Sequence, residues 1–476
     1  HVHPGAPEQQ QQPAQPVPAE ALTPVERLTP PVAPPGVSRE LPATPQAASD
    51  QGPLLRLEDL ERMALESNPT IAQSEAAVRA AEGRRRQAGA FPNPVVGYSG
   101  EELGLRAPFS QGGEHKVFAE QTIPIGKLGR SRRIFAREKE QTEALAEAQR
   151  QRVLNSVRVL YYDALGAQRM VELRAELARL SSEAVEITRE LFNVGQADKP
   201  DYLEIEIEAQ RAEIDRLRAE NDREQVWRAL GAMVGRPDLR PTRLVGNLEE
   251  AAGALEEEQV LATLLRDSPE VRSARAGIER ARAVVSRARA ERIPDLFLRG
   301  DLGSARSFDP AHTGRQLEGS IEAGITIPIW DRKSGAIAAA QAELEIAERE
   351  LQRLQLSLRA RASAGFREYR NALQVVEKYR TRIIPAARDA YDMYLSNFKQ
   401  MAASYPQVLI AQRTLFQVQA EYARALVDVR RAGVELRGYL LTGGLEALAR
   451  PGESGEATEG FKLRSASEAS GETDNR

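Results

Sequence analysis

The chain has 476 residues, and its 65 Lys and Arg residues nearly balance its 69 Asp and Glu residues, leaving a formal net charge of −4. This balance gives no electrostatic reason to expect nucleic-acid binding. The lack of cysteine excludes disulfides and thiolate metal sites, and no apolar run approaches the roughly 18 residues that a transmembrane helix needs. Ala, Leu, Glu, Arg and Gln dominate the middle of the chain, as is typical of long helices.

The chain opens with a polar segment at residues 1–53 that is rich in Pro, Gln and Ala. It has too few apolar side chains to offset the entropy of ordering, so we expect a disordered or extended N-terminal arm. Two helices are expected next, at Leu57–Ser67 and Pro69–Ala90, and the prolines of 91–94 end the second. Strands are predicted at Asn93–Leu103 and Glu114–Ile123.

Two longer helices follow, over Leu128–Asn193 and about Asp201–Val234, joined by the turn Val194–Pro200. The same series then recurs about 200 residues later. Asn68-Pro69 matches Ser268-Pro269, and the tetrapeptide Thr-Ile-Pro-Ile occurs at 122–125 and again at 326–329. An internal repeat is stronger evidence for the architecture of a chain than any single motif.

The repeat predicts two halves, residues 54–250 with a strand pair at 93–124 and residues 251–445 with a strand pair at 294–328. In the second half we expect a short helix and helices at 269–292, 331–399 and 404–442. Residues 446–476 are rich in Ser, Glu and Gly and are expected to form a disordered tail.

The predicted helix over 331–399 has roughly 69 residues and would be on the order of 100 Å long. Apolar residues recur at heptad spacing, for example Ile337, Leu344 and Leu351. A helix of this length does not fit an ordinary globular core and indicates a coiled coil or a helical repeat. Its charges exclude a membrane span. Pro385 is expected to kink it locally.

The predicted strands alternate apolar and polar residues. Leu317, Ile321 and Ile325 would share one strand face, with Glu318 and Glu322 on the other. About ten alternating residues also match a tilted strand that crosses a bilayer. A single soluble hairpin resting on a helix explains each pair equally well. Four strands cannot close a barrel and open edges are excluded from hydrocarbon, so a spanning barrel requires several chains. Three chains would supply about twelve strands.

The pattern resembles the TolC family of outer-membrane efflux proteins over nearly all of residues 54–445, and within it the CzcC/CusC heavy-metal branch. The residues that carry the resemblance are Ser67-Asn68-Pro69, Asp267-Ser268-Pro269, Phe91-Pro92-Asn93-Pro94, both Thr-Ile-Pro-Ile segments, Val194-Gly195, Leu230-Gly231 and Val234-Gly235-Arg236-Pro237. The resemblance implies a homotrimer with a twelve-stranded barrel in outer-membrane lipid and a helical tunnel across the periplasm. It implies as partners a periplasmic adaptor protein and a proton-driven pump in the inner membrane.

The resemblance also assigns roles to the two helical tips. Val194, Gly195, Asn397 and Gln400 are predicted to contact the adaptor; the alternative is that they only reverse the helices. Family members often carry aspartates just after the second tip, where this chain has Gln407 and Ile410. An acidic ring is therefore not expected, and the tunnel would instead be narrowed by Phe398, Tyr405 and Gln407.

The sequence predicts no catalytic centre, metal site or cofactor. It contains no phosphate-binding loop and no HExxH motif, and neither His115 nor His312 stands at metal-ligand spacing from similar residues. If His1 is the natural N-terminus, its amine with His3 offers nitrogen ligands suited to copper or nickel. The expected function is export of heavy-metal cations or of drugs. The alternative is a soluble coiled-coil scaffold or adaptor without a pore.

Overall fold

The computed structural model describes residues 54–101, 114–250, 253–306, 314–400 and 405–448. The described residues all belong to one compact unit. The predicted N-terminal arm, His1, His3, His312 and most of the predicted tail lie outside the described residues.

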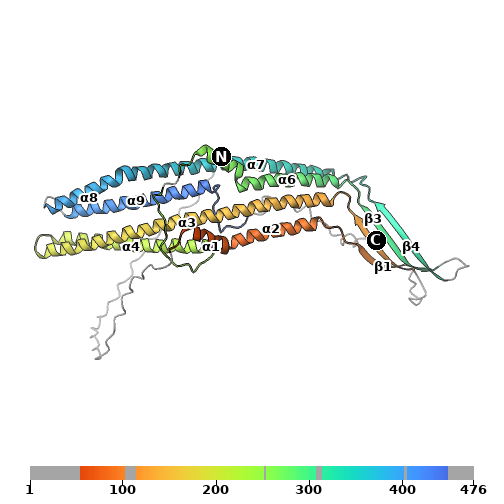
Figure 1. Ribbon diagram of the computed structural model, residues 1–476, viewed down its shortest axis with the longest axis horizontal. Helices are drawn as coiled ribbons and strands as arrows, with labels where there is room; N and C mark the ends of the chain where they lie inside the picture. Colours follow the sequence, from red (N-terminus) through yellow and green to blue (C-terminus); the bar gives the residue numbers. More distant parts are fainter. Residues whose placement is uncertain (1–53, 102–113, 251–252, 307–313, 401–404, 449–476) are drawn as a thin grey trace, which may run out of the picture. The chain divides into compact units, whose positions relative to one another are not determined.

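Helices and strands follow one another in the same order twice (Figure 1). The first half comprises α1 (Leu57–Ser67), α2 (Pro69–Ala88), β1 (Val95–Glu101), β2 (Glu114–Ile123), α3 (Leu128–Asn193) and α4 (Lys199–Met233). The second comprises α5 (Glu257–Asp267), α6 (Pro269–Ala290), β3 (Leu296–Arg306), β4 (Arg315–Ile325), α7 (Ser334–Lys378), the π-helical turn η1 (Tyr379–Ile383), α8 (Ile384–Lys399) and α9 (Tyr405–Arg437). The predicted mainly helical fold with an internal repeat is confirmed, while the residue at which one half gives way to the other stays a prediction.

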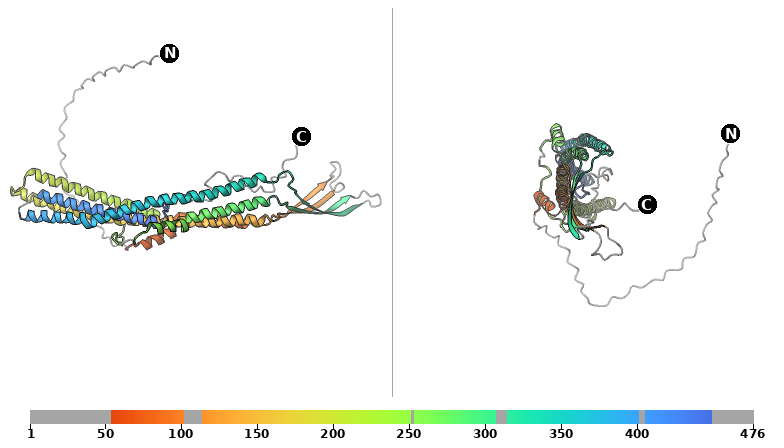
Figure 2. Two further views of the ribbon diagram at one scale, coloured as in Figure 1. Left: turned by 90° about the horizontal axis from the view of Figure 1, so that it is seen from above. Right: turned by 90° about the vertical axis from the view of Figure 1, so that its right-hand side faces the viewer.

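Helix α3 runs the length of the helical bundle and joins its parts (Figures 1 and 2). Near the sheet it packs against α2 and α6, and farther away it packs against α4 and α9. Helix α9 in turn packs against α7 and α8. Both helical tips, α3 to α4 and α8 to α9, therefore lie at the end of the bundle that is remote from the sheet (Figure 2).

A buried core holds α1 and α4 against the middle of α3. Its fully buried members include Leu60, Val153 and Trp227. At its edge Asn68 ends α1 and starts α2, because its side-chain oxygen accepts a hydrogen bond from the backbone nitrogen of Thr70 at 2.9 Å. The Asn68 amide also donates to the carbonyl of Met233 at 2.7 Å, which ties this break to the end of α4.

The four strands form one antiparallel sheet in the order β1-β2-β3-β4. The central β2–β3 pair, with Val117 opposite Leu302, joins the two halves of the chain. Strand β2 includes the first two residues of its Thr-Ile-Pro-Ile segment, whereas β4 ends at Ile325, just before the second such segment. The reason is that β3 begins at Leu296, opposite Ile325, so Thr326 has no residue of β3 to pair with.

Two predicted helices differ from the observed ones by more than two residues at one end. The long helix begins at Ser334 because Lys333 adopts a left-handed backbone conformation with φ of 55°. The π-helical turn η1 follows this helix and ends two residues before Pro385, and the backbone amide of Ile384 donates to the carbonyl of Tyr379. Proline lacks an N–H and so removes one α-helical hydrogen bond, which accounts for the irregular turn at this position.

Helix α9 ends at Arg437, five residues short of the predicted 442. The buried side-chain amide of Asn155 on α3 donates to the carbonyls of Gly438 and Leu441, at 2.7 and 2.9 Å. These bonds stabilise the turn that follows the helix. Tyr439 and Leu440 of this turn have positive φ. A contact made 283 residues along the chain therefore fixes this helix end.

Candidate functional site

The sheet has one apolar face that is exposed in the isolated chain. Because residues opposite each other in the ladders point to the same side, the register groups the apolar residues of all four strands. The exposed large members of this face are Val96, Tyr98, Val117, Leu298, Leu302, Leu317, Ile321 and Ile325. Ile321 is 90% exposed and Leu317 is 76% exposed. A contiguous apolar surface of this kind indicates contact with lipid or with another protein.

The opposite face of the sheet carries charged side chains that interact with one another. Lys116 pairs with Glu114 at 2.7 Å, and Ser320 donates a hydrogen bond to Asp301. The guanidinium carbon of Arg299 lies 4.4 Å from the centre of the Phe118 ring. None of the described helices covers either face, since the sheet extends beyond the end of the bundle (Figure 1). The sheet is thus apolar on one side and polar on the other, as a spanning strand layer with a wet interior requires.

The first tip, between α3 and α4, closes with a Schellman motif. Gln196 donates its amide to the carbonyl of Leu191 at 2.8 Å, and Gly195 donates to Phe192 at 3.0 Å. Gly195 has φ of +75°, a conformation that side chains disfavour. Apart from Gly195 and its two chain neighbours, no described residue has an atom within 4 Å of the position that a Cβ would occupy. Val194 is 69% exposed beside it.

The second tip is described on both sides of residues 401–404. Phe398 and Tyr405, two of the predicted narrowing residues, lie together with ring centres 4.9 Å apart. Burial, with smaller contributions from Tyr391 and Glu183, raises the pKa of Tyr405. Asn397, Gln400 and Gln407 are exposed. The structure therefore brings the two aromatic residues into contact and leaves the three amide side chains on the surface.

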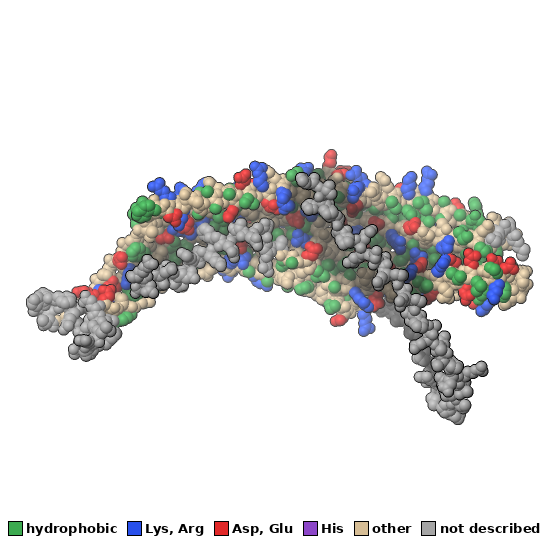
Figure 3. Space-filling view, turned by 180° about the vertical axis from the view of Figure 1, so that it is seen from behind, with side chains coloured by type: hydrophobic (Ala, Val, Ile, Leu, Met, Phe, Trp, Pro, Cys, Tyr) green, Lys and Arg blue, Asp and Glu red, His purple; other side chains and the backbone are tan. Residues whose placement is uncertain are grey.

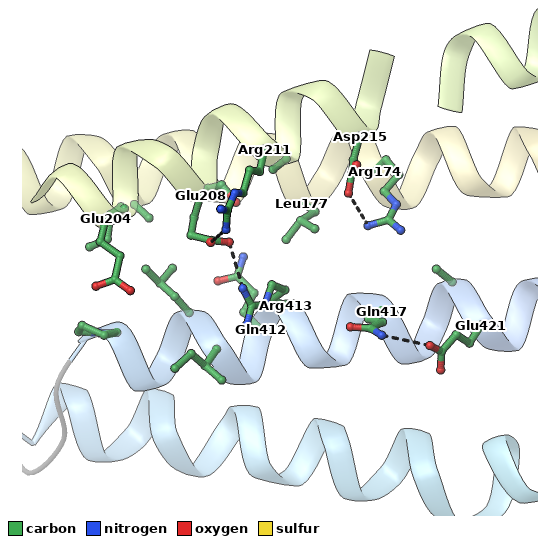
Figure 4. A pocket seen from close by; sticks show the side chains of 18 of the residues that line it. Arg174, Leu177, Glu204, Glu208, Arg211, Asp215, Gln412, Arg413, Gln417 and Glu421 are labelled. Carbon is green, nitrogen blue, oxygen red and sulfur yellow. Dashed lines mark hydrogen bonds and ion pairs between the residues drawn. The ribbon is translucent and has the colours of Figure 1, made fainter. Parts of the chain in front are cut away.

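A groove of about 440 Å³ separates the α3–α4 hairpin from α9 close to these tips (Figure 4). Its walls are mostly polar. Arg174 of α3 pairs with Asp215 of α4 at 3.3 Å, and Arg413 of α9 reaches across to Glu208 of α4 at 3.2 Å. The Glu208–Arg413 pair thus links the two helical hairpins through the groove (Figure 4).

The sequence did not indicate this groove. Arg413 lies 205 residues from its partner Glu208, so the contact depends on how the hairpins pack. One clue was available, because Glu208 and Arg413 each follow the start of the returning helix by a similar distance and carry opposite charges.

Charged groups elsewhere on the helices mostly pair along one helix surface. Arg179 with Glu176 and Arg216 with Glu213 are examples of the i, i+3 spacing. Acidic and basic side chains are accordingly mixed over the helical faces (Figure 3). Within the described part of the chain, no group of three or more His, Cys, Asp and Glu side chains is arranged to hold a metal ion.

The described helices include none with a stretch sufficiently long and apolar to span a membrane.

Two helical hairpins that carry one sheet with an exposed apolar face and a charged face define a channel subunit of the TolC type. The sequence supports this class, because residues 60–236 and 260–442 match the family described as "outer membrane efflux protein". The chain belongs to this family. The two matched stretches fall one in each half of the repeat.

Particular relatives extend the comparison. The chain is 25% identical to the cobalt-zinc-cadmium resistance protein CzcC of Cupriavidus metallidurans over 400 residues, which is 83% of this chain and 91% of that protein. Among solved structures, the outer membrane protein VceC of Vibrio cholerae aligns with a TM-score of 0.65 at 18% identity, covering 82% of this chain and 96% of VceC. CusC aligns with a TM-score of 0.63 at 19% identity, covering 81% of this chain and 92% of CusC. The predicted family, outer-membrane location and efflux function are confirmed.

Proposed function

We propose that three copies of the chain form one pore, in which their sheets close a barrel of twelve strands in the outer membrane. In the described residues the outer edges of β1 and β4 have no strand partner. Backbone groups left unpaired in hydrocarbon are costly, so a spanning sheet must close on itself or on neighbours. Three four-stranded sheets fit the even strand numbers of bacterial barrels. The exposed apolar face of the sheet, uncovered by any described helix, is the observation that carries this proposal.

The helices offer a matching surface for neighbouring copies. On α4 the exposed large apolar residues are Leu203, Ile207, Ile214 and Leu217. Their spacing of four, seven and three positions places them along one seam, as in a coiled coil. Packing of this seam against an adjacent copy would bury it and continue the barrel as a helical tunnel through the periplasm.

The tips are the remote ends of this tunnel, and they receive the partner proteins in the proposal. Val194, Gly195, Asn397 and Gln400 contact a periplasmic adaptor, which links the tunnel to a proton-driven pump of the inner membrane. Exposure of Val194, Asn397 and Gln400 supports the contact. Phe398, Tyr405 and Gln407 narrow the entrance, supported by the contact between the two aromatic rings.

The proposed cargo is divalent heavy-metal cations, because the CzcC relative is named for resistance to cobalt, zinc and cadmium. A channel without fixed metal sites suits conduction, since tight binding slows exit. The energy for export then comes from the inner-membrane pump.

A deletion strain tests the function. Loss of the gene should lower the tolerated concentrations of cobalt, zinc or cadmium, and a copy supplied on a plasmid should restore them. Drug sensitivity without metal sensitivity would contradict the cargo assignment. Normal tolerance of both, with the protein recovered in the soluble fraction, would favour the scaffold alternative.

A further inference from the structure

The helix ends next to the sheet carry an unusual excess of positive charge. The segments 84–94, 124–136, 285–295 and 328–340 contain twelve Lys and Arg residues but three Asp and Glu residues. The whole chain, by contrast, has 65 basic and 69 acidic residues. These four segments are the end of α2, the start of α3, the end of α6 and the start of α7, with their connections to the strands.

Specific contacts hold the four segments together at the end of the helical bundle that adjoins the sheet. Lys127, just before α3, pairs with Asp295, just before β3, at 2.8 Å. Arg287 near the end of α6 donates to the Ser131 hydroxyl on α3 at 2.8 Å. Two further contacts complete the set, Arg84 of α2 with Glu138 of α3 at 2.8 Å and Arg292 with the carbonyl of Arg332 at 3.0 Å. We call the basic residues of these segments the basic collar.

Several guanidinium groups of the basic collar are not neutralised. Among the described residues, Arg132, Arg133 and Arg289 are exposed and form no ion pair. Arg292 and Arg332, also exposed, have only backbone carbonyls as hydrogen-bond acceptors. A guanidinium has five N–H donors in a planar fork that matches phosphate oxygens. These side chains therefore keep donors available for an anionic oxygen ligand.

Exposed apolar and aromatic side chains lie at the same level. Trp330, two residues before Arg332, is 92% exposed, and Phe91, five residues after Arg86, is 54% exposed. Ile329 and Ile125 are also exposed in these connections. Trp is enriched where hydrocarbon meets headgroups, and arginine extends its charged end toward headgroups from apolar surroundings. In Figure 3 Lys and Arg side chains are seen along the helices up to the end that adjoins the sheet.

We propose that the basic collar binds the phosphate groups of anionic phospholipids in the inner leaflet of the outer membrane. The proposal rests on the outer-membrane placement of the sheet, which puts hydrocarbon around its apolar face and headgroups at its helical end. Bound lipid phosphates would neutralise the collar and fix the height of the barrel in the bilayer. In the trimer of the proposed function, three collars would form a continuous basic ring.

The test compares two variants of the full-length protein purified in mild detergent. In the collar variant, Arg132, Arg133, Arg289 and Arg292 are replaced by Gln. In the control variant, Arg359, Arg367, Arg382 and Arg388, exposed residues of the long helix and its continuation, are replaced by Gln. Native mass spectrometry measures the phosphatidylglycerol retained by each, and titration with phosphatidylglycerol or phosphatidylcholine measures affinity.

Wild type and control variant should bind phosphatidylglycerol in preference to phosphatidylcholine, and the preference should weaken as salt rises. Each collar arginine removed should weaken the binding about fivefold, so the collar variant, which lacks four of them, should bind on the order of 600-fold more weakly. Equal phosphatidylglycerol binding by the collar and control variants overturns the proposal.

Two further measurements keep the test decisive. Should the Gln variant fail to fold, the corresponding Lys variant retains the charge and loses the planar fork, and it should bind phosphatidylglycerol more weakly than wild type but better than phosphatidylcholine. Phosphatidylglycerol binding by that Lys variant as tight as that of wild type also overturns the proposal.

If the collar faces the tunnel, the Gln variant will change the ion selectivity of channels in planar bilayers without changing lipid retention, which contradicts the proposal. Lipid binding is measured without pump or adaptor. The lipid proposal can therefore fail while metal resistance persists, and the export function can fail while lipid binding persists.

Discussion

Arg413 and Glu208 form an ion pair 3.2 Å long between α9 and α4, across the groove that separates the two helical hairpins near their tips. Glu208 also contacts Arg211 on its own helix at 2.8 Å. The side chains of Arg413 and Glu208 are 55% and 31% exposed. An exposed pair of this kind contributes about 0.2–1 kcal/mol to stability, so its importance lies in where it restrains the hairpins.

Reversing one charge of this pair should loosen the tips. Arg413→Glu places two carboxylates opposite each other, and we expect an increased single-channel conductance in planar bilayers with a stability loss of no more than about 1 kcal/mol. The double variant Glu208→Arg with Arg413→Glu restores opposite charges and should return the conductance to the wild-type value. Unchanged conductance in the single variant would show that the pair does not restrain the tips.

The π-helical turn gives a pH-dependent prediction. The Tyr379 hydroxyl donates to Glu421 on α9 at 2.6 Å, and Gln417 donates to the same carboxylate at 3.1 Å. These bonds hold the pKa of Glu421 below its ordinary value of 4.5, and the bond from Tyr379 makes the largest contribution. A lowered pKa means that the folded state favours the ionised carboxylate, so the stabilisation is present above pH 4.5 and is lost as the pH falls through the folded-state pKa.

Tyr379→Phe should therefore destabilise the protein by about 1 kcal/mol at pH 7, and the difference from wild type should shrink in acid. Chemical denaturation in detergent, followed by circular dichroism at pH 7 and pH 3, measures both values. Tyr394→Phe on α8, where the tyrosine is 40% exposed, is the matched control and should change the stability at neither pH. A difference that grows in acid would contradict the assignment of the hydrogen bond to the ionised carboxylate.

The adaptor contact predicts loss of metal resistance at two adjacent positions. Val194→Glu puts a charge on an exposed apolar side chain in an ordinary backbone conformation, with φ of −98°, and should abolish metal resistance while trimers persist in the membrane. Gly195→Asn keeps the left-handed turn, which asparagine tolerates, but it adds a side chain at the proposed contact and should therefore also lower resistance. Bacterial growth on graded metal concentrations, with trimers checked in membrane extracts, gives the comparison. Full resistance with Val194→Glu would remove the tip assignment.

The two faces of the sheet should respond differently to charge. Ile321 lies in the middle of β4 on the apolar face, and Ile321→Arg should destabilise the proposed barrel by about 2–4 kcal/mol. Glu322→Gln, on the opposite face of the same strand, should be tolerated. The amount of each variant in outer-membrane fractions is the measurement. Equal amounts would mean that the apolar face does not contact lipid.

Much of this fold follows from local patterns. The sequence predicts α3 at Leu128–Asn193 and β2 at Glu114–Ile123, the same residues as observed, because long apolar periodicity and strict alternation each favour one structure. Pro385 was expected to kink the long helix, and the π-helical turn before it is the form that the irregularity takes.

Features that depend on distant residues were not predictable in this way. The end of α9 is set by Asn155 on another helix, and the pairing of β2 with β3 requires both hairpins to be in place. The Glu208–Arg413 pair likewise arises from packing of hairpins remote in sequence. The predicted roles of Val194, Gly195, Asn397 and Gln400, and of Phe398, Tyr405 and Gln407, remain predictions, since a single chain contains neither the adaptor nor the neighbouring copies.

The number of copies in the membrane-extracted complex tests the central claim most directly. Native mass spectrometry of protein extracted from outer membranes in mild detergent should give the mass of three chains, and the protein should not be recovered without detergent. A single chain that stays dispersed in plain buffer would show that the open edges and apolar face of the sheet need no sister copies, and would contradict the account of the pore.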